Sequence, residues 1–137
     1  MSLIEHSDKL TRIFGRWPSF HDAEVLRLVL DRTGSEGPTL EVQIHVFAAT
    51  SEVDSTGHYM LKDHTLVTLR FTEVAIEKLQ WFNRQNVLFE LSISEVAPVA
   101  HDGRRLRVEM PSSYGLEATF ECQRAIVSDV RPYEAAA

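Results

Sequence analysis

Alternation of apolar and polar residues is the feature of this sequence that most constrains its fold. Every second residue is apolar from Leu40 to Val46, from Val67 to Phe71, from Leu106 to Met110 and from Leu116 to Cys122. Successive side chains of an extended chain point to opposite faces, so this spacing places the apolar residues together on one face. The alternation therefore predicts β-strands with one buried face and one polar face.

Six segments are predicted as strands, namely 24–31, 40–46, 64–72, 87–94, 106–110 and 116–122. Turn-forming residues at 33–38 and the dipeptide Asp102-Gly103 predict short connections, which favour antiparallel neighbours. Residues 50–63 lack a clear period and are predicted to form a loop. Residues 74–86 are expected to hold either a helical turn or a bulged strand.

One short helix is predicted near residues 7–15. Ser7 is a suitable N-cap, and Asp8 places a negative charge in the first turn, near the positive end of the helix dipole. Apolar residues follow at helical spacing, namely Leu10, Ile13, Phe14 and Trp17. Gly15 is suited to end the helix, and Pro18 cannot extend it.

Together these elements predict an α+β fold. Its main part is one curved, mostly antiparallel sheet of about six strands, with the short helix packed on its apolar face. Because that helix is too short to cover the face, we expect the sheet to curl, to pack on a second sheet portion or to dimerise. The whole chain, residues 1–137, has the size of a single domain.

Composition narrows the function classes. The chain carries 20 acidic residues against 14 Lys and Arg, a net charge of −6, which argues against a nucleic-acid partner. No apolar run reaches the roughly 18 residues of a membrane span, so no membrane association is expected. The N-terminus lacks the pattern of a secretory signal, and Cys122 is the one cysteine, so the cytoplasm is the expected location. Cys122 lies on the alternating pattern, which predicts a buried, unreactive thiol.

The joint between the helix and the first strand, residues 15–23, combines Trp17 and Phe20 with the adjacent pair His21 and Asp22. A His–Asp pair is able to supply a general base with its orienting carboxylate, or a metal ligand. On an extended chain, however, neighbours point to opposite faces and are badly placed to bond each other. We favour a structural joint, in which the aromatic rings anchor the helix and the polar pair binds backbone groups of the loop.

No catalytic motif or local metal signature is present. The six histidines show no H-x-x-x-H spacing, so neither a metal nor another cofactor is expected, although ligands from distant strands, such as His21 with His45 or His64, remain an alternative. Outward glutamates, namely Glu41, Glu90, Glu109, Glu117 and Glu121, are typical of solvated strand faces, and they offer only a weak analogy to a glycosidase pair.

The segment Leu79 to Asn86 is a second notable stretch. Trp81, Asn83, Arg84 and Asn86 lie close together in it, as in interface hot spots, where an aromatic ring is surrounded by hydrogen-bonding groups. The alternative is that Trp81 or Phe82 fills the end of the core while the asparagines shape a turn. Both interpretations stay open. His45 and Glu41, on the polar face of the strand 40–46, complete the candidate binding residues.

Four segments carry a resemblance to a known family, namely FGRWPSFHDA (14–23), EVLRLVLDR (24–32), FNRQNVLFEL (82–91) and SSYGLEATFEC (112–122). Through them the chain resembles immunity protein 50, a group of small immunity proteins of bacterial polymorphic toxin systems. The resemblance implies a protein that binds and neutralises a co-encoded toxin, and it brings no catalytic residues. Two other functions compete with it: a small enzyme or metal-binding domain that uses His21 and Asp22, and a homodimeric structural module.

Overall fold

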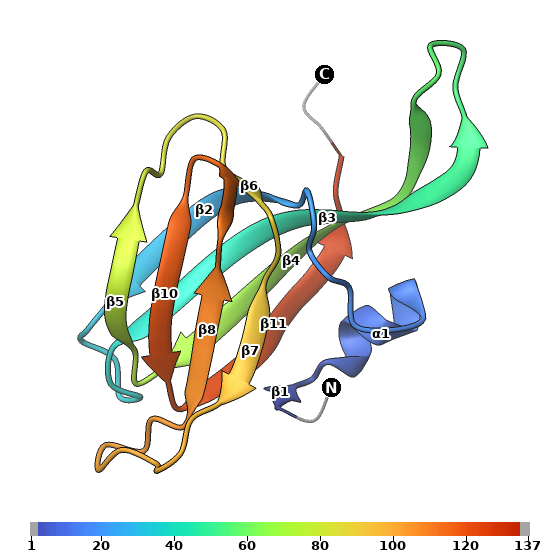
Figure 1. The fold of residues 1–137 in the computed structure, drawn as a ribbon. Helices are drawn as coiled ribbons and strands as arrows, with labels where there is room; N and C mark the ends of the chain where they lie inside the picture. Colours follow the sequence, from blue (N-terminus) through green and yellow to red (C-terminus); the bar gives the residue numbers. More distant parts are fainter. Residues whose placement is uncertain (1–2, 135–137) are drawn as a thin grey trace.

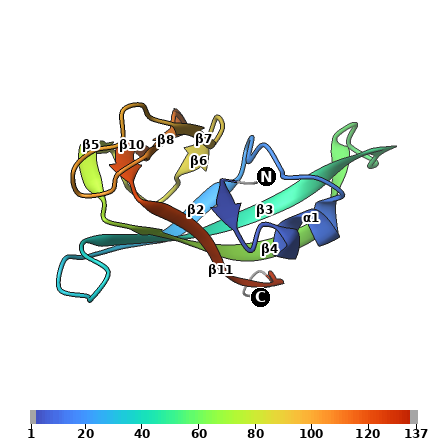
Figure 2. The same ribbon diagram turned by 90° about the horizontal axis from the view of Figure 1, so that it is seen from below.

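Two β-sheets lie face to face and enclose the apolar core. The computed structural model describes residues 3–134 of the chain, and Figures 1 and 2 show the two layers from the front and from below. The larger sheet has the order β1-β11-β4-β3-β2-β6-β9, with β1 at Ile4–Glu5, β11 at Arg124–Pro132, β4 at Tyr59–Thr72, β3 at Thr39–Val53, β2 at Glu24–Asp31, β6 at Val87–Leu88 and β9 at Ser112–Tyr114. The smaller sheet has the order β5-β10-β8-β7, with β5 at Ala75–Gln80, β10 at Glu117–Cys122, β8 at Leu106–Met110 and β7 at Ser92–Glu95.

The predicted mostly antiparallel α+β fold with one short helix is correct, but the single sheet of about six strands is wrong. Every pair of neighbouring strands is antiparallel except β1 with β11. Of the three expected ways to hide the apolar face, the chain uses a second sheet. Only Gln123 separates β10 in one sheet from β11 in the other. Apolar and polar residues alternate in the same way before and after the chain passes from one sheet to the other. The alternation therefore does not show that the strands belong to two sheets.

The core lies where the alternation predicts it. Leu40, Val42, Ile44 and Val46 of β3 are buried, as are Val67, Leu69 and Phe71 of β4 and the apolar residues of β8 and β10. Phe71 and Phe120 meet between the two sheets with ring centroids 5.0 Å apart and an edge-to-face geometry that aromatic pairs favour. Burial of these side chains is the main stabilising contribution to the fold.

In two segments, the buried residues do not follow a regular alternation along one strand. A bulge in β2 between Val25 and Arg27 buries Val25 and leaves Leu26 at 38% exposure, so the apolar residues at every second position, Leu26, Leu28 and Leu30, are only partly covered. Residues 87–94 do not form the one predicted strand but two short ones, in different sheets; Leu88 is buried, whereas Phe89 is exposed.

Residues 50–63 are not the predicted loop. Strands β3 and β4 continue past the body of the protein as a two-stranded ribbon that ends in a turn at 54–58, and we call residues 48–62 the arm (Figure 1). In the turn, the Asp54 carboxylate accepts hydrogen bonds from the Thr56 hydroxyl and from the backbone N–H groups of His58 and Thr56, which stabilise its charged form and lower its pKa. No core lies against the arm, so neither of its faces requires apolar residues. This is why its sequence shows no clear alternation of apolar and polar residues.

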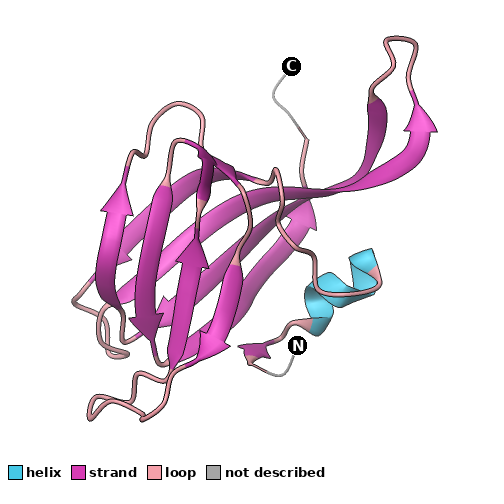
Figure 3. Cartoon of the chain, viewed as in Figure 1, coloured by secondary structure: helices cyan, strands magenta, loops and turns pink. Residues whose placement is uncertain are grey.

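The helix α1, Asp8–Phe14, lies beside the four-stranded sheet and contacts β11 (Figure 3). Leu10 is fully buried, whereas Ile13, also predicted on the buried stripe, is exposed. Gly15 ends the helix in the left-handed conformation, and its N–H donates to the carbonyl of Thr11. None of the helices in residues 3–134 has the length and apolar character needed to cross a membrane.

Candidate functional site

The loop that follows β5 is held in place by the side chain of Asn86, which is only 3% exposed. Its Oδ1 accepts hydrogen bonds from the backbone N–H groups of Asn83 (2.9 Å) and Leu116 (3.1 Å). Its Nδ2 donates to the carbonyl of Asn83 at 2.7 Å. One buried amide thus joins the loop to the segment between β9 and β10 and satisfies backbone groups that burial would otherwise leave unpaired.

Gly115 allows the two segments to approach each other closely. Its φ of +75° is one that glycine adopts at low cost. A Cβ atom at this position would lie 2.2 Å from the carbonyl oxygen of Gln85 and 2.8 Å from Oδ1 of Asn86. Residues 81–86 and 115 therefore form one tightly fitted unit.

This unit displays two aromatic rings to solvent. Trp81 is 64% exposed and Phe82 is 51% exposed, so neither ring fills the end of the core. Trp81 also has a φ of +67°, a conformation that a bulky residue rarely adopts. Asn83 supports it, since its Nδ2 donates to the carbonyl of Trp81 at 2.8 Å.

The two rings border a groove where β9 of the larger sheet meets the ends of β5 and β10. The groove has a volume of about 630 Å³ and is lined by Trp81, Phe82, Asn83, Ser112, Ser113, Tyr114, Gly115 and Glu117. We call it the Trp81 groove; the loop after β5 and the start of β10, which contribute to it, lie at the upper left of Figure 1. Tyr114 is a third exposed ring, at 58%. The lining thus combines three solvent-exposed aromatic side chains with one carboxylate.

Ion pairs cover the outward side of the four-stranded sheet, and one end of this set reaches the groove at Glu117. Arg104 contacts Asp102 and Glu121, Arg107 contacts Glu77 and Glu109, and Lys78 contacts Glu117. Three of the outward glutamates from the sequence, Glu109, Glu117 and Glu121, belong to this set. Each of the three contacts a basic side chain.

Glu41 and His45 lie elsewhere, on the outward face of β3 in the larger sheet. Glu41 is 3.9 Å from Arg27. Nε2 of His45 is 2.9 Å from Nδ1 of His64, and its ring lies 4.1 Å from that of Tyr133. Burial, and secondarily the charge of His64, lowers the pKa of His45. The structure thus brings His45 and His64 together, but neither lies with Trp81 or with His21.

The joint residues occupy a turn and not an extended segment. Phe20 and Asp22 have φ values of +63° and +64°. The expected extended geometry is therefore wrong, and Nε2 of His21 lies 3.6 Å from Oδ2 of Asp22. This distance is still too long for a hydrogen bond, so the two side chains do not bond each other as a catalytic pair would. Instead, Nδ1 of His21 donates to the carbonyl of Phe89 at 2.8 Å.

The aromatic residues of the joint pack beside it. Phe20 is buried, and its ring centroid lies 5.5 Å from that of Trp17, which is partly buried against the core. These contacts, together with the hydrogen bond from His21, attach the segment after the helix to both the core and the chain near Phe89.

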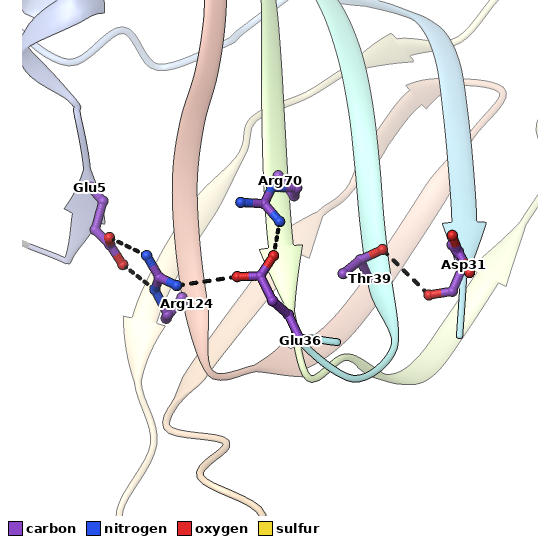
Figure 4. A network of polar contacts seen from close by, with 6 residues as sticks. All are labelled: Glu5, Asp31, Glu36, Thr39, Arg70 and Arg124. Carbon is purple, nitrogen blue, oxygen red and sulfur yellow. Dashed lines mark hydrogen bonds and ion pairs between the residues drawn. The ribbon is translucent and has the colours of Figure 1, made fainter. Parts of the chain in front are cut away.

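A second polar network lies on the outward face of the larger sheet (Figure 4). Arg124 of β11 makes two hydrogen bonds to the Glu5 carboxylate, at 2.6 and 2.7 Å, and contacts Glu36 at 3.3 Å. Glu36 in turn accepts a hydrogen bond from Arg70 of β4. The hydrogen bond from Arg124 lowers the pKa of Glu5. The network connects β1, β11, β4 and the β2–β3 turn, and its alternating charges compensate one another.

Across the described residues 3–134, no group of three or more His, Cys, Asp or Glu side chains is arranged to hold a metal ion. Cys122 is buried, as its sequence pattern predicts, and burial raises its pKa to about 12. The thiolate form that a nucleophile needs is thus strongly disfavoured.

Sequence reasoning selected Trp81, Asn83 and Asn86 but missed the other side of the groove. Tyr114, Gly115 and Glu117 come from a segment about 30 residues further along the chain. The run Ser112-Ser113-Tyr114-Gly115 is rich in turn formers and holds an aromatic residue. This composition is the sequence feature that could have indicated the second side of the groove. Arg84 is exposed in the same loop but does not line the groove.

Comparison with known proteins gives one result. The family model for immunity protein 50 matches residues 6–133, which includes both sides of the groove and the joint. Neither the search of curated proteins nor the search of solved structures finds a match. Since the family model spans nearly the entire chain, this protein belongs to the immunity protein 50 family.

Proposed function

We propose that this chain is a non-enzymatic immunity protein that neutralises a toxin by direct contact, and that the Trp81 groove is the centre of the contact. Membership of the immunity protein 50 family supports the first part. The display of Trp81, 64% exposed on a loop fastened by Asn86, is the observation that carries the second. The net charge of −6 favours a protein over a nucleic acid as partner, and we place the encounter in the cytoplasm.

Exposed aromatic rings on a rigid support are well suited to protein recognition. Interface hot spots are enriched in Trp, Tyr and Arg and lie in pockets that exclude water on binding. Trp81, Phe82 and Tyr114 offer large apolar area, and Ser112, Ser113 and Asn83 offer hydrogen-bonding groups beside it. Because the loop is already ordered, binding loses little conformational entropy.

The backbone at Trp81 supports the same conclusion. A positive φ at a bulky residue costs about 1–3 kcal/mol and persists only where its surroundings enforce it. Here Asn83, Asn86 and Gly115 supply the enforcing contacts. The chain thus maintains a strained conformation whose effect is to present an apolar ring to solvent, and this favours a role in binding.

Co-expression with the toxin-like product of a neighbouring gene tests the proposal. Size-exclusion chromatography is expected to show one complex for the unaltered chain. Trp81→Ala should weaken that complex about 30-fold, since truncation of a hot-spot residue costs about 2 kcal/mol or more. Each protein run alone on the same column gives the reference elution volumes. A catalytic assay of the immunity protein by itself should show no turnover.

Tyr59→Ala is the matched control. Tyr59 is as exposed as Trp81, at 67%, but lies on the arm. We expect this variant to keep full affinity. Separate elution with every neighbouring toxin-like product would contradict the function, whereas loss of binding with Tyr59→Ala and not with Trp81→Ala would contradict only the assignment to the groove.

A further inference from the structure

The ion pairs on the outward side of the four-stranded sheet, which run from Glu117 at the Trp81 groove to Glu121 near the far end of β10, leave an excess of negative charge. Their five carboxylates, Glu77, Asp102, Glu109, Glu117 and Glu121, face only three basic side chains, Lys78, Arg104 and Arg107. Each of the two arginines is shared between two carboxylates. The outward side of this sheet therefore attracts a basic surface.

Glu117 is the point where this charged surface meets the groove. It is the one Asp, Glu, Lys or Arg among the eight lining residues. Its contacts with the side chains of Gln80 (2.9 Å) and Lys78 (3.5 Å) both use Oε2. Among the described residues, Oε1 of Glu117 makes no side-chain hydrogen bond or ion pair.

The aromatic side chains of the lining favour the same kind of ligand. The face of an indole or phenol ring carries negative electrostatic potential and attracts cations. Trp81 and Tyr114 are both more than half exposed at the groove. Aromatic faces next to a carboxylate thus favour a side chain that is flat, cationic and able to donate several hydrogen bonds.

We propose that the groove binds an arginine side chain of the protein partner, with its guanidinium against the Trp81 ring and hydrogen-bonded to Glu117. The proposal rests on the proposed function, since it names the chemistry of the partner at the same site. Arginine fits better than lysine because its planar group stacks on aromatic rings and is more weakly hydrated than an ammonium group. The excess carboxylates along the sheet then face further basic residues of that partner.

A small-molecule titration tests this without the toxin. The two indole N–H signals, from Trp17 and Trp81, are followed by ¹⁵N NMR while N-acetyl-arginine amide is added up to about 50 mM, a range suited to millimolar dissociation constants. N-acetyl-citrulline amide, which has the same shape without the charge, is the matched probe. We expect the Trp81 signal to shift, with arginine binding about threefold more tightly than citrulline, as an exposed ion pair allows.

Two variants locate the charge effect. Glu117→Gln should make the two probes bind equally, while Glu121→Gln, at the other end of β10 and paired with Arg104, should keep the threefold difference. Absence of a Trp81 shift, or equal binding of arginine and citrulline to the unaltered chain, would overturn the proposal. The toxin complex and its loss in Trp81→Ala would still stand in that case, so the two proposals fail separately.

Discussion

Substitution of Asn86 by alanine is the sharpest test of how the candidate site is built. The amide makes three hydrogen bonds of 3.1 Å or less, from the N–H groups of Asn83 and Leu116 and to the carbonyl of Asn83. A fourth contact, from Nδ2 to the carbonyl of Val25 at 3.5 Å, is too long to add much. Alanine would therefore leave three backbone groups of the loop and of the segment before β10 without their partner.

The expected loss of stability follows from these contacts. Each hydrogen bond contributes about 1 kcal/mol net, and a buried group left unpaired costs about 1–3 kcal/mol, so we expect Asn86→Ala to lower the free energy of unfolding by about 3 kcal/mol. For a chain of 137 residues, that corresponds to a fall in Tm of roughly 10 °C.

Urea unfolding followed by circular dichroism measures this change. The midpoint should fall while the slope with denaturant stays the same, because the surface exposed on unfolding does not change. Asn83→Ala is the control: its side chain is exposed and bonds only within the loop, to the carbonyl of Trp81 and the N–H of Gln85, so we expect a loss below about 1 kcal/mol. A loss below about 1 kcal/mol for Asn86→Ala as well would refute the conclusion that this amide holds the loop.

Three further measurements check other parts of the structure. Gly115→Ala should destabilise the fold by about 2 kcal/mol or more in the same urea assay, because alanine is strained at φ +75° and its Cβ would collide with the carbonyl of Gln85; an unchanged midpoint would contradict the close approach. The pKa of His45 should lie below the usual histidine value near 6.5 in an NMR titration, and it should rise in His64→Asn. Because a lowered pKa means that the fold favours the neutral ring, the free energy of unfolding should fall as the pH drops below about 6.5. This fall should be smaller in His45→Gln. Cys122 should resist a thiol reagent at pH 8 in the native protein and react fully in denaturant; rapid native labelling would show that the thiol is accessible.

The sequence predicts the central strands well because burial there is one-sided and complete. Alternation in β3 and β4 gives the correct inward residues, such as Ile44 and Leu69. It fails in β2, where the bulge after Val25 shifts the parity, since nothing in the residues Val25-Leu26 distinguishes a bulge from a regular strand. It also fails to separate the sheets, because a residue buried in either layer has the same apolar character.

The candidate site is predictable on one side only. The composition of residues 81–86 indicates an aromatic residue among hydrogen-bonding groups, and the structure places Trp81 and Asn83 on the groove. Tyr114 and Glu117 reach it because they pair with Val87 and Gln80, the residues on either side of the loop. Contacts of this kind depend on tertiary arrangement, which local periodicity does not encode.

The arm is a part of the surface that contributes no residue to the buried core, so changes in it have little effect on the stability of the fold. Of the described residues between Phe47 and Leu66, none belongs to the buried core cluster, which takes Val46 from β3 and Val67 from β4. Val53, Tyr59, Met60 and Leu61 are exposed on the arm. Mutations there remove no core contact, so we expect the arm to tolerate changes in length and sequence that leave the two-sheet body unchanged. Substitutions in the arm should therefore change the surface of the protein while the free energy of unfolding stays nearly the same.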